Sequence, residues 1–304
     1  MKERAVLFGR TNSLVGVVTE PERPISGGTQ PAAILLNAGL IHRVGPNRIN
    51  VQIARRLAAS GFPVMRLDLA GIGDSENRTD DLSLKDGIVS DAKEAMDFFA
   101  REEGARQFIV MGICSGANNS LRIAANDARV IGAVPIEPYH FSTPAYHFYY
   151  FSRRLLDLRC WRRALTMKSD FWGILRNKIG GGNAYRANRG SGRAAREQGR
   201  ALKSQILSEV QGLLSRDINL HLVYCVDSPS YYNHYLPLRK QAVSCPQFRV
   251  SLFTNTDHTF TSLASQNSLV NSIDEWVKAA VEPASRCRDF QNTPNSEDFS
   301  SSSG

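Results

Sequence analysis

The chain has 304 residues, of which 42% are hydrophobic, and its formal net charge is +8. It contains no run of about 18 or more apolar residues, which excludes a predicted membrane span. Its five cysteines are odd in number and widely spaced, which excludes a disulfide framework or a paired-cysteine metal site.

Taken in chain order, short apolar runs alternate with amphipathic segments. The predicted strands cover residues 5–10, 14–20, 32–37, 63–67, 108–111, 130–136, 219–226 and 248–253. The predicted helices cover residues 47–60, 86–103, 117–125, 201–214, 231–243 and 262–281. The first two strands are expected to form an N-terminal hairpin. The later alternation predicts an α/β fold, with a mostly parallel sheet and helices on both faces.

Residues 139–203 interrupt this alternation. They begin with a run of aromatic side chains, and residues 153–203 hold fourteen Lys and Arg against three Asp and Glu, a net charge of +11. The pattern predicts four parts: a first core segment (1–138), an inserted basic and aromatic-rich lid (139–203), a second core segment (204–282) and a disordered Ser- and Asn-rich tail (283–304).

The stretch from Gln107 to Ser120, QFIVMGICSGANNS, carries the strongest functional signal. An apolar strand runs into Gly112-Ile113-Cys114-Ser115-Gly116, and a helix rich in small residues follows. Strand, sharp turn and helix are the setting in which G-x-S-x-G acts as a nucleophile elbow. Here Cys114 occupies the central position, where serine is usual, so the sequence predicts a thiol nucleophile.

A nucleophilic thiol needs a base, and the base needs a group that orients it. In a sheet of this kind these residues follow one another in the chain as nucleophile, acid and base. Cys114, Asp227 and His258 have this order, and each follows a predicted strand. We therefore expect His258 to accept the thiol proton and Asp227 to hold the imidazole in the required tautomer.

The same chemistry needs two backbone N–H donors for the oxyanion of the intermediate. One is expected from Ser115, the residue after the nucleophile. The other is expected from Gly39 or Leu40, in the loop after the third strand. No metal or organic cofactor is required.

Five pieces of the sequence resemble the α/β-hydrolases, namely NAGLIHRVGPNR, RLDLAGIGDSE, GICSGA, CVDSP and DHTF. The first three look closest to the hydrolases associated with exosortase and exopolysaccharide gene systems, which have cysteine at the elbow. The resemblance implies an α/β-hydrolase fold, and it implies the triad at Cys114, Asp227 and His258. The elbow is also similar to those of dienelactone hydrolases and polyhydroxyalkanoate synthases.

A thiol nucleophile forms a thioester intermediate, which suits transfer of acyl groups between thioesters. We therefore expect a thioesterase or acyltransferase whose substrate is a thioester of coenzyme A or of an acidic acyl carrier protein. The basic lid would receive that acidic partner, and Tyr139, His140 and Phe141 would begin an acyl pocket. Two alternatives stay open: an esterase or dienelactone-type hydrolase of small activated esters, and a non-catalytic hydrolase-like binding protein.

Each candidate residue also has a structural interpretation. Cys114 could be a small buried hydrophobe, and His258 a surface-loop histidine. Asp227 could only start a turn, which leaves Asp257 as a weaker candidate for the acid. His42 and Arg43 could bind an anionic group of the substrate, or could only stabilise the loop that carries them. The remaining cysteines are expected to be inert; they are Cys160, Cys225, Cys245 and Cys287.

Two further expectations concern partners and location. The glycine-rich segment Gly71-Ile72-Gly73 is predicted to be a tight turn, because no Gly-Lys-Ser follows it as in a phosphate loop. Nucleic acid is not an expected partner, because no recognised binding motif is present. The first residues lack the apolar segment of a signal peptide, and scattered cysteines fit a reducing compartment, so a cytoplasmic location is expected.

Overall fold

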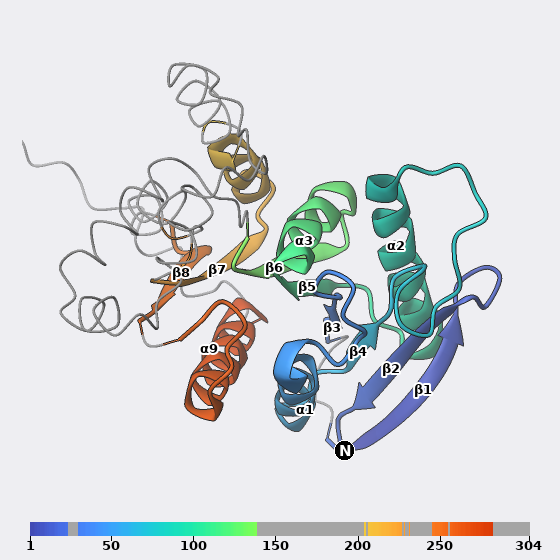
Figure 1. Cartoon of the computed structure of the whole chain (residues 1–304), viewed down its shortest axis with the longest axis horizontal. Coiled ribbons are helices and arrows are strands. Elements are labelled where there is room, and N and C mark those ends of the chain that lie inside the picture. Colours follow the sequence, from blue (N-terminus) through green and yellow to red (C-terminus); the bar gives the residue numbers. More distant parts are fainter. Residues whose placement is uncertain are drawn as a thin grey trace, which may run out of the picture.

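One eight-stranded sheet organises the chain (Figure 1). The computed structural model describes residues 1–23, 30–138, 204, 206–226, 228, 231, 245–254 and 256–281. The strands are β1 (Lys2–Phe8), β2 (Leu14–Glu20), β3 (Ala32–Leu35), β4 (Val64–Leu67), β5 (Phe108–Ile113), β6 (Val130–Ile136), β7 (Asn219–Cys225) and β8 (Phe248–Phe253). Their order in the sheet is β1-β2-β4-β3-β5-β6-β7-β8. Strand β2 is antiparallel to β1 and β4, and all other neighbouring pairs are parallel.

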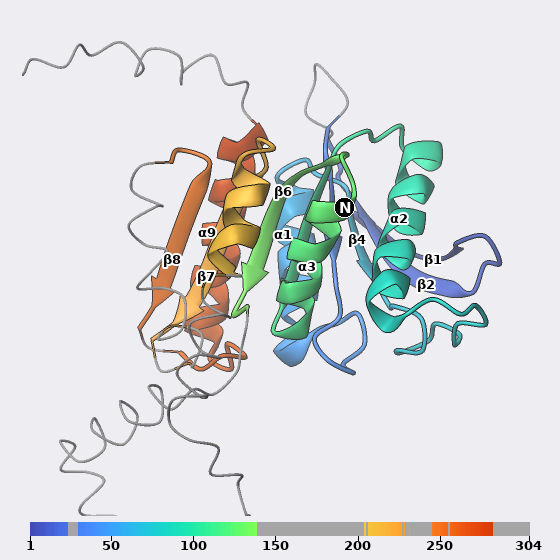
Figure 2. The ribbon, with the colours of Figure 1, turned by 90° about the horizontal axis from the view of Figure 1, so that it is seen from above.

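Helices cover both faces of the sheet, as Figures 1 and 2 show. The described helices are the short 3-10 helix η1 (Pro46–Arg48), α1 (Ile49–Ala59), α2 (Leu84–Glu102), α3 (Ser115–Asn126) and α9 (Leu263–Val281), and residues 206–214 are also helical. Helices α1 and α9 pack on one face, where one apolar cluster forms. Helices α2 and α3, with residues 206–214, pack on the other face over a second cluster. The central part of the sheet is therefore a buried middle layer, and its edge strands β1 and β8 are partly exposed.

The central strands are largely apolar because both of their faces are covered, and the one charged residue of β3, β4 and β5 is Arg66, which pairs with Glu3. Every residue of β3, β4 and β5 is buried. A parallel strand between two helical layers has no solvent side, so an unbroken apolar run, rather than an alternating pattern, marks it in the sequence. The predicted mostly parallel sheet with helices on both faces is confirmed.

Several predicted boundaries are wrong by two or three residues. The first strand begins at Lys2 and ends at Phe8, because Lys2 pairs with Glu20 across the hairpin and Gly9 turns into the left-handed region at φ 88°. Helix α2 begins at Leu84 because the Ser83 side chain caps it, accepting from the Asp86 N–H at 3.2 Å.

Some predictions lie outside the described residues. These are the inserted lid (139–203), the tail (283–304) and nearly all of the predicted helix at 231–243. Within the ranges described, none of the helices combines the length and the apolar character needed to cross a membrane.

A buried histidine of β7 contacts both β8 and α9. His221 of β7 is fully buried, and its Nε2 lies 2.8 Å from Ser251 Oγ of β8. Its ring lies against Trp276 of α9, with centroids 5.6 Å apart. Its Nδ1 has no hydrogen-bond partner among the described residues. Burial, together with the charge of Arg249, lowers the pKa of His221 to about 3.

This lowered pKa makes stability depend on pH. Between pH 6.5 and 3 the unfolded chain binds a proton at His221 that the folded chain does not, so stability falls as pH falls. From pH 7 to pH 5 the loss is about 2 kcal/mol for this one group. We expect His221→Gln to be less stable than wild type at pH 7 but to lose about 2 kcal/mol less on acidification. Urea unfolding at both pH values measures this, and equal pH dependence in the two proteins would contradict it.

Candidate active site

The strand-to-helix turn after β5 holds one residue in a strained conformation. Cys114 has φ 58° and ψ −115°, a region that side chains with a Cβ rarely adopt. Its N–H donates to the Ile136 carbonyl of β6 at 2.9 Å, and its carbonyl accepts from Ala117 N–H at 3.1 Å. Both contacts fix the backbone of Cys114, so the direction in which its side chain leaves the turn is set by the sheet and the helix.

Two glycines allow three backbone segments to meet at this turn. A Cβ placed on Gly112 would lie 2.4 Å from the carbonyl carbon of Gly116. A Cβ placed on Gly116 would lie 2.5 Å from the carbonyl oxygen of Asn37, the second residue of the loop after β3. Neither position has room for a side chain, and the elbow therefore requires glycine on both sides of Cys114.

The Cys114 thiol is half-buried and packs against the core beneath α1 and α9. It lies at the N-terminus of α3, where the first backbone N–H groups have no partner within the helix. This position favours negative charge that develops beside the turn, such as that of an oxyanion.

The loop after β3 contacts the elbow directly. The Gly39 N–H donates to Ser115 Oγ at 2.6 Å, so this N–H is already engaged. In the described part of the chain, the N–H groups of Leu40 and Ser115 have no acceptor. Gly39 and Leu40 were the two candidates for the one donor expected from this loop. The geometry favours Leu40, because the Gly39 N–H already holds the loop against α3. The Leu40 side chain is 89% exposed beside the elbow.

A buried carboxylate holds this loop in place. Asp68, which follows β4 and is fully buried, accepts from Arg43 N–H at 2.6 Å and from Asn37 Nδ2 at 3.1 Å. The Arg43 guanidinium pairs with Asp68 and lies 2.7 Å from Asp74. Two carboxylates therefore neutralise Arg43. For Arg43 this favours loop stabilisation over the binding of a substrate anion, whereas His42 is exposed.

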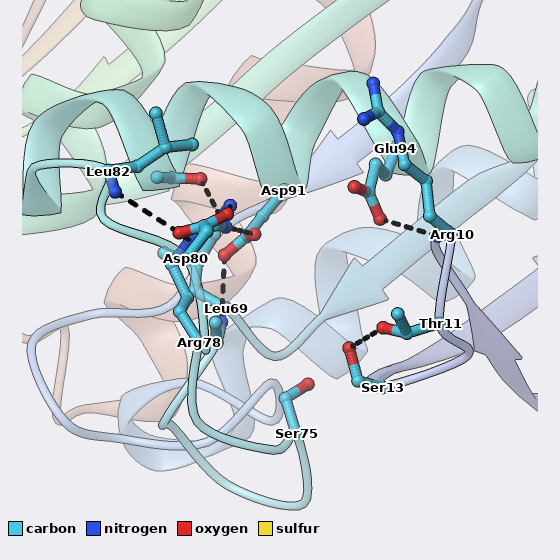
Figure 3. Close-up of polar contacts among 12 residues, drawn as sticks. Arg10, Thr11, Ser13, Leu69, Ser75, Arg78, Asp80, Leu82, Asp91 and Glu94 are labelled. Carbon is cyan, nitrogen blue, oxygen red and sulfur yellow. Dashed lines mark hydrogen bonds and ion pairs between the residues drawn. The ribbon is translucent and has the colours of Figure 1, made fainter.

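The segment that follows Asp68 is a structural turn anchored on α2 (Figure 3). Asp91 of α2 accepts from Ala70 N–H at 2.9 Å and pairs with Arg78. Burial raises the pKa of Asp91 above its usual range. Ser75 Oγ donates to the Asp68 carbonyl at 2.7 Å and accepts from Val15 N–H at 2.9 Å. These contacts fit the interpretation of this segment as a turn rather than a phosphate loop.

His258 lies on the loop after β8. Strands β5 to β8 are parallel, so the elbow and this loop follow strand ends at the same edge of the sheet (Figure 2), the edge at which ligands bind in open α/β sheets. The His258 side chain is exposed. Among the contacts of the described residues, no hydrogen bond joins it to the Cys114 thiol. Such bonds are often long in unliganded sites and tighten when substrate binds.

The neighbours of His258 fix the loop that carries it. The Asp257 carboxylate accepts from Thr261 N–H at 2.9 Å and from Thr261 Oγ1 at 2.6 Å. Asn47 Nδ2 donates to the Thr259 carbonyl at 3.2 Å, which ties the loop to the residues just before α1. Because Thr261 donates both of these hydrogen bonds to the Asp257 carboxylate, Asp257 stabilises its own loop. It remains the weaker candidate for an acid that orients His258.

Other predicted site residues lie outside the described residues. They are Asp227, Tyr139, His140 and Phe141. In the part of the chain that the structure describes, no group of three or more His, Cys, Asp or Glu side chains is arranged to hold a metal ion.

One buried acid at this edge was not predicted. Glu137 directly follows β6, is fully buried, and has a left-handed backbone with φ 56°. The signal in the sequence was a carboxylate at the end of an apolar strand and before a proline, a position where a charged residue is not expected to be buried without a partner.

Comparisons with known proteins agree with this architecture. The sequence model of the family described as "Serine aminopeptidase, S33" matches residues 31–178. An esterase from Pyrococcus furiosus is 14% identical, with a TM-score of 0.53, over 91% of this chain and 92% of the other. A proline iminopeptidase from Mycobacterium smegmatis is 15% identical, with a TM-score of 0.55, over 92% and 98%.

A third solved structure, from Xanthomonas campestris and described as a member of the α/β serine hydrolases without a lid, is 13% identical. Its TM-score is 0.50, over 92% of this chain and 95% of the other. No curated protein matches the sequence. At these identities the likeness extends to the fold and no further.

The glycine contacts at the elbow make a test. Gly116→Ala must push the Asn37 carbonyl away, and we expect a loss of about 1–3 kcal/mol in the free energy of unfolding. Gly212→Ala is the matched control: it lies in the helical residues 206–214 with nothing within 4 Å of its added Cβ, so it should gain up to about 1 kcal/mol. Urea unfolding compares them. A Gly116→Ala variant as stable as wild type would show that the backbones do not meet as described.

Proposed function

We propose, on the premise that the chain has the α/β-hydrolase fold, that it hydrolyses or transfers acyl groups of activated esters and thioesters with Cys114 as its nucleophile. The observation that carries the proposal is the conformation of Cys114. A cysteine held at φ 58° between two obligatory glycines, at the N-terminus of α3, costs stability that core packing alone does not explain.

The reaction runs in two stages. His258 takes the proton of the Cys114 thiol, and the thiolate attacks the acyl carbonyl carbon. The tetrahedral intermediate places its oxyanion toward the N–H groups of Ser115 and Leu40. As the intermediate collapses, His258 returns the proton to the departing alcohol or thiol, and the acyl group stays on Cys114 as a thioester.

In the second stage an acceptor releases the acyl group. His258 takes a proton from water, which attacks the thioester and regenerates the thiol with a free acid. An alcohol, amine or thiol in place of water gives acyl transfer. Asp227 holds the His258 ring in the tautomer that accepts the proton and stabilises the imidazolium.

The substrate class follows from the nucleophile and the fold. Attack by a thiol on an acyl ester gives a thioester, and attack on a thioester is an exchange between groups of similar energy, so thioesters of coenzyme A or an acyl carrier are suitable donors. The similar fold of an esterase supports simple activated esters equally well. Both classes therefore belong in the first test.

The covalent intermediate is the most direct test. Incubation with p-nitrophenyl butyrate and with butyryl-coenzyme A should add the mass of one butyryl group to the intact protein. Cys114→Ala should show no adduct, and Cys245→Ala, which leaves the proposed nucleophile in place, should still show it. An adduct of equal yield on Cys114→Ala would assign the nucleophile to another residue.

Alkylation separates an enzyme from a binding protein. We expect iodoacetamide to modify Cys114 faster than it modifies a short cysteine peptide or the half-buried Cys245, because the proposed base His258 takes the thiol proton as the sulfur attacks. His258→Gln should slow this alkylation and lower kcat for p-nitrophenyl butyrate by about 10²–10⁴. Labelling of Cys114 at the rate of the peptide, with no turnover, would favour the non-catalytic alternative.

A further inference from the structure

Glu137 lies where one strand ends and its neighbour continues. Strand β6 ends at Ile136, and the left-handed backbone of Glu137, with φ 56°, turns the chain away from the sheet. The Glu137 N–H donates to the Val223 carbonyl of β7 at 2.9 Å. Beyond this bond the main chain of β6 can no longer pair with β7, although β7 continues to Cys225.

The Glu137 side chain supplies the next hydrogen-bond acceptor for β7, in place of the main chain of β6. Its carboxylate oxygen Oε1 accepts a hydrogen bond from the Cys225 N–H. A carboxylate thus occupies the place of the next strand carbonyl and satisfies a buried donor that would otherwise lack a partner on this side. On the side that faces β6, the end of β7 is therefore held by a side chain, while β8 pairs with it on the other side.

Those residues in turn hold the loop that carries His258. Cys225 Sγ donates to the Asp257 carbonyl at 3.4 Å, and Val226 N–H donates to the Phe253 carbonyl at the end of β8 at 3.0 Å. Asp257 directly precedes His258. A chain of contacts therefore runs from Glu137 through Cys225 to the loop of the proposed base.

The other side of Glu137 leads to the elbow. Ile136, the residue before it, accepts from the Cys114 N–H at 2.9 Å. Glu137 accordingly stands between the backbone that fixes the nucleophile and the backbone that fixes the base. Glu137 also acts on the neighbouring Tyr224. Burial raises the pKa of that phenol, and the negative charge of Glu137 raises it further.

We propose that Glu137 is a positioning residue that sets the distance between Cys114 and His258, acting through Cys225. A fully buried carboxylate is costly to desolvate, and the bond to the end of β7 explains its presence at this edge. The inference rests on the proposed function, because it concerns the geometry of that pair.

The test compares variants that keep or remove each contact. Glu137→Leu removes the acceptor, and Glu137→Gln keeps an oxygen for the Cys225 N–H. Cys225→Ala removes the donor to Asp257, and Cys225→Ser keeps one. Asp274→Asn is the matched control, since Asp274 of α9 is also a buried carboxylate but pairs with Arg56, Ser60 and Lys278 away from the elbow.

The expected result is a loss of kcat, with KM for p-nitrophenyl butyrate within about twofold of wild type. Glu137→Leu should lower kcat at least tenfold, and Glu137→Gln should recover most of it. Cys225→Ala should lower kcat several-fold, and Cys225→Ser should leave it unchanged. In the double variant Glu137→Leu/Cys225→Ala, the fold-loss of kcat should be smaller than the product of the two single losses, because both substitutions act on one chain of contacts. Asp274→Asn should lower the melting temperature and leave kcat unchanged.

Three outcomes would overturn the proposal. One is a folded Glu137→Leu variant with the kcat of wild type. The second is a loss of kcat that follows the melting temperature across all variants, Asp274→Asn included, which would make the role of Glu137 merely structural. If Glu137→Leu does not fold, equal kcat in Cys225→Ala and Cys225→Ser is the third.

Failure of the proposed function looks different. It would appear as a wild-type protein with no acyl adduct and no dependence of Cys114 alkylation on His258, before any variant of Glu137 is made. In that case the positioning role proposed for Glu137 would also be wrong.

Discussion

Three backbones meet at one point in this protein, and the rest of the site depends on that contact. The end of β5, the first turn of α3 and the start of the loop after β3 approach so closely at Gly112, Gly116 and Asn37 that no side chain fits between them. This close packing allows α3 to begin one residue after Cys114, and it holds Cys114 in a left-handed conformation. The positions of Cys114, of the N-terminus of α3 and of the loop after β3 are thus all set by this one contact.

The packing is supported by buried charge on both sides. Asp68 holds Asn37 and Arg43 on the side of β4, and Glu137 holds the end of β7 on the other. Both acids are fully buried, and each accepts hydrogen bonds from backbone N–H groups. Buried carboxylates of this kind are costly unless their oxygens are satisfied, and these two form their hydrogen bonds at the positions where the loops leave the edge of the sheet.

Much of the fold could be predicted because its signals are local. Apolar runs marked the strands, and Gly-x-Cys-x-Gly marked the elbow, since the requirement for glycine arises within five residues. The pairing of Arg43 with Asp68, 25 residues away, and of Glu137 with Cys225, 88 residues away, could not be predicted, because such contacts exist only once the strand order is set. For the same reason the sequence left two interpretations of Arg43 open, binding of a substrate anion and stabilisation of its loop, and the pairing with two carboxylates of the same chain favours the second.

Asn47 has a consequence for the whole site. Asn47 lies in η1, between the loop after β3 and α1, in a left-handed conformation with φ 52°. Its side chain donates a hydrogen bond to the carbonyl of Thr259, 212 residues further along the chain, in the loop that carries His258. The loop proposed to supply the oxyanion donors and the loop that carries His258, the proposed base, are thereby joined by a hydrogen bond. The relative position of these two loops depends on Asn47 as well as on the sheet.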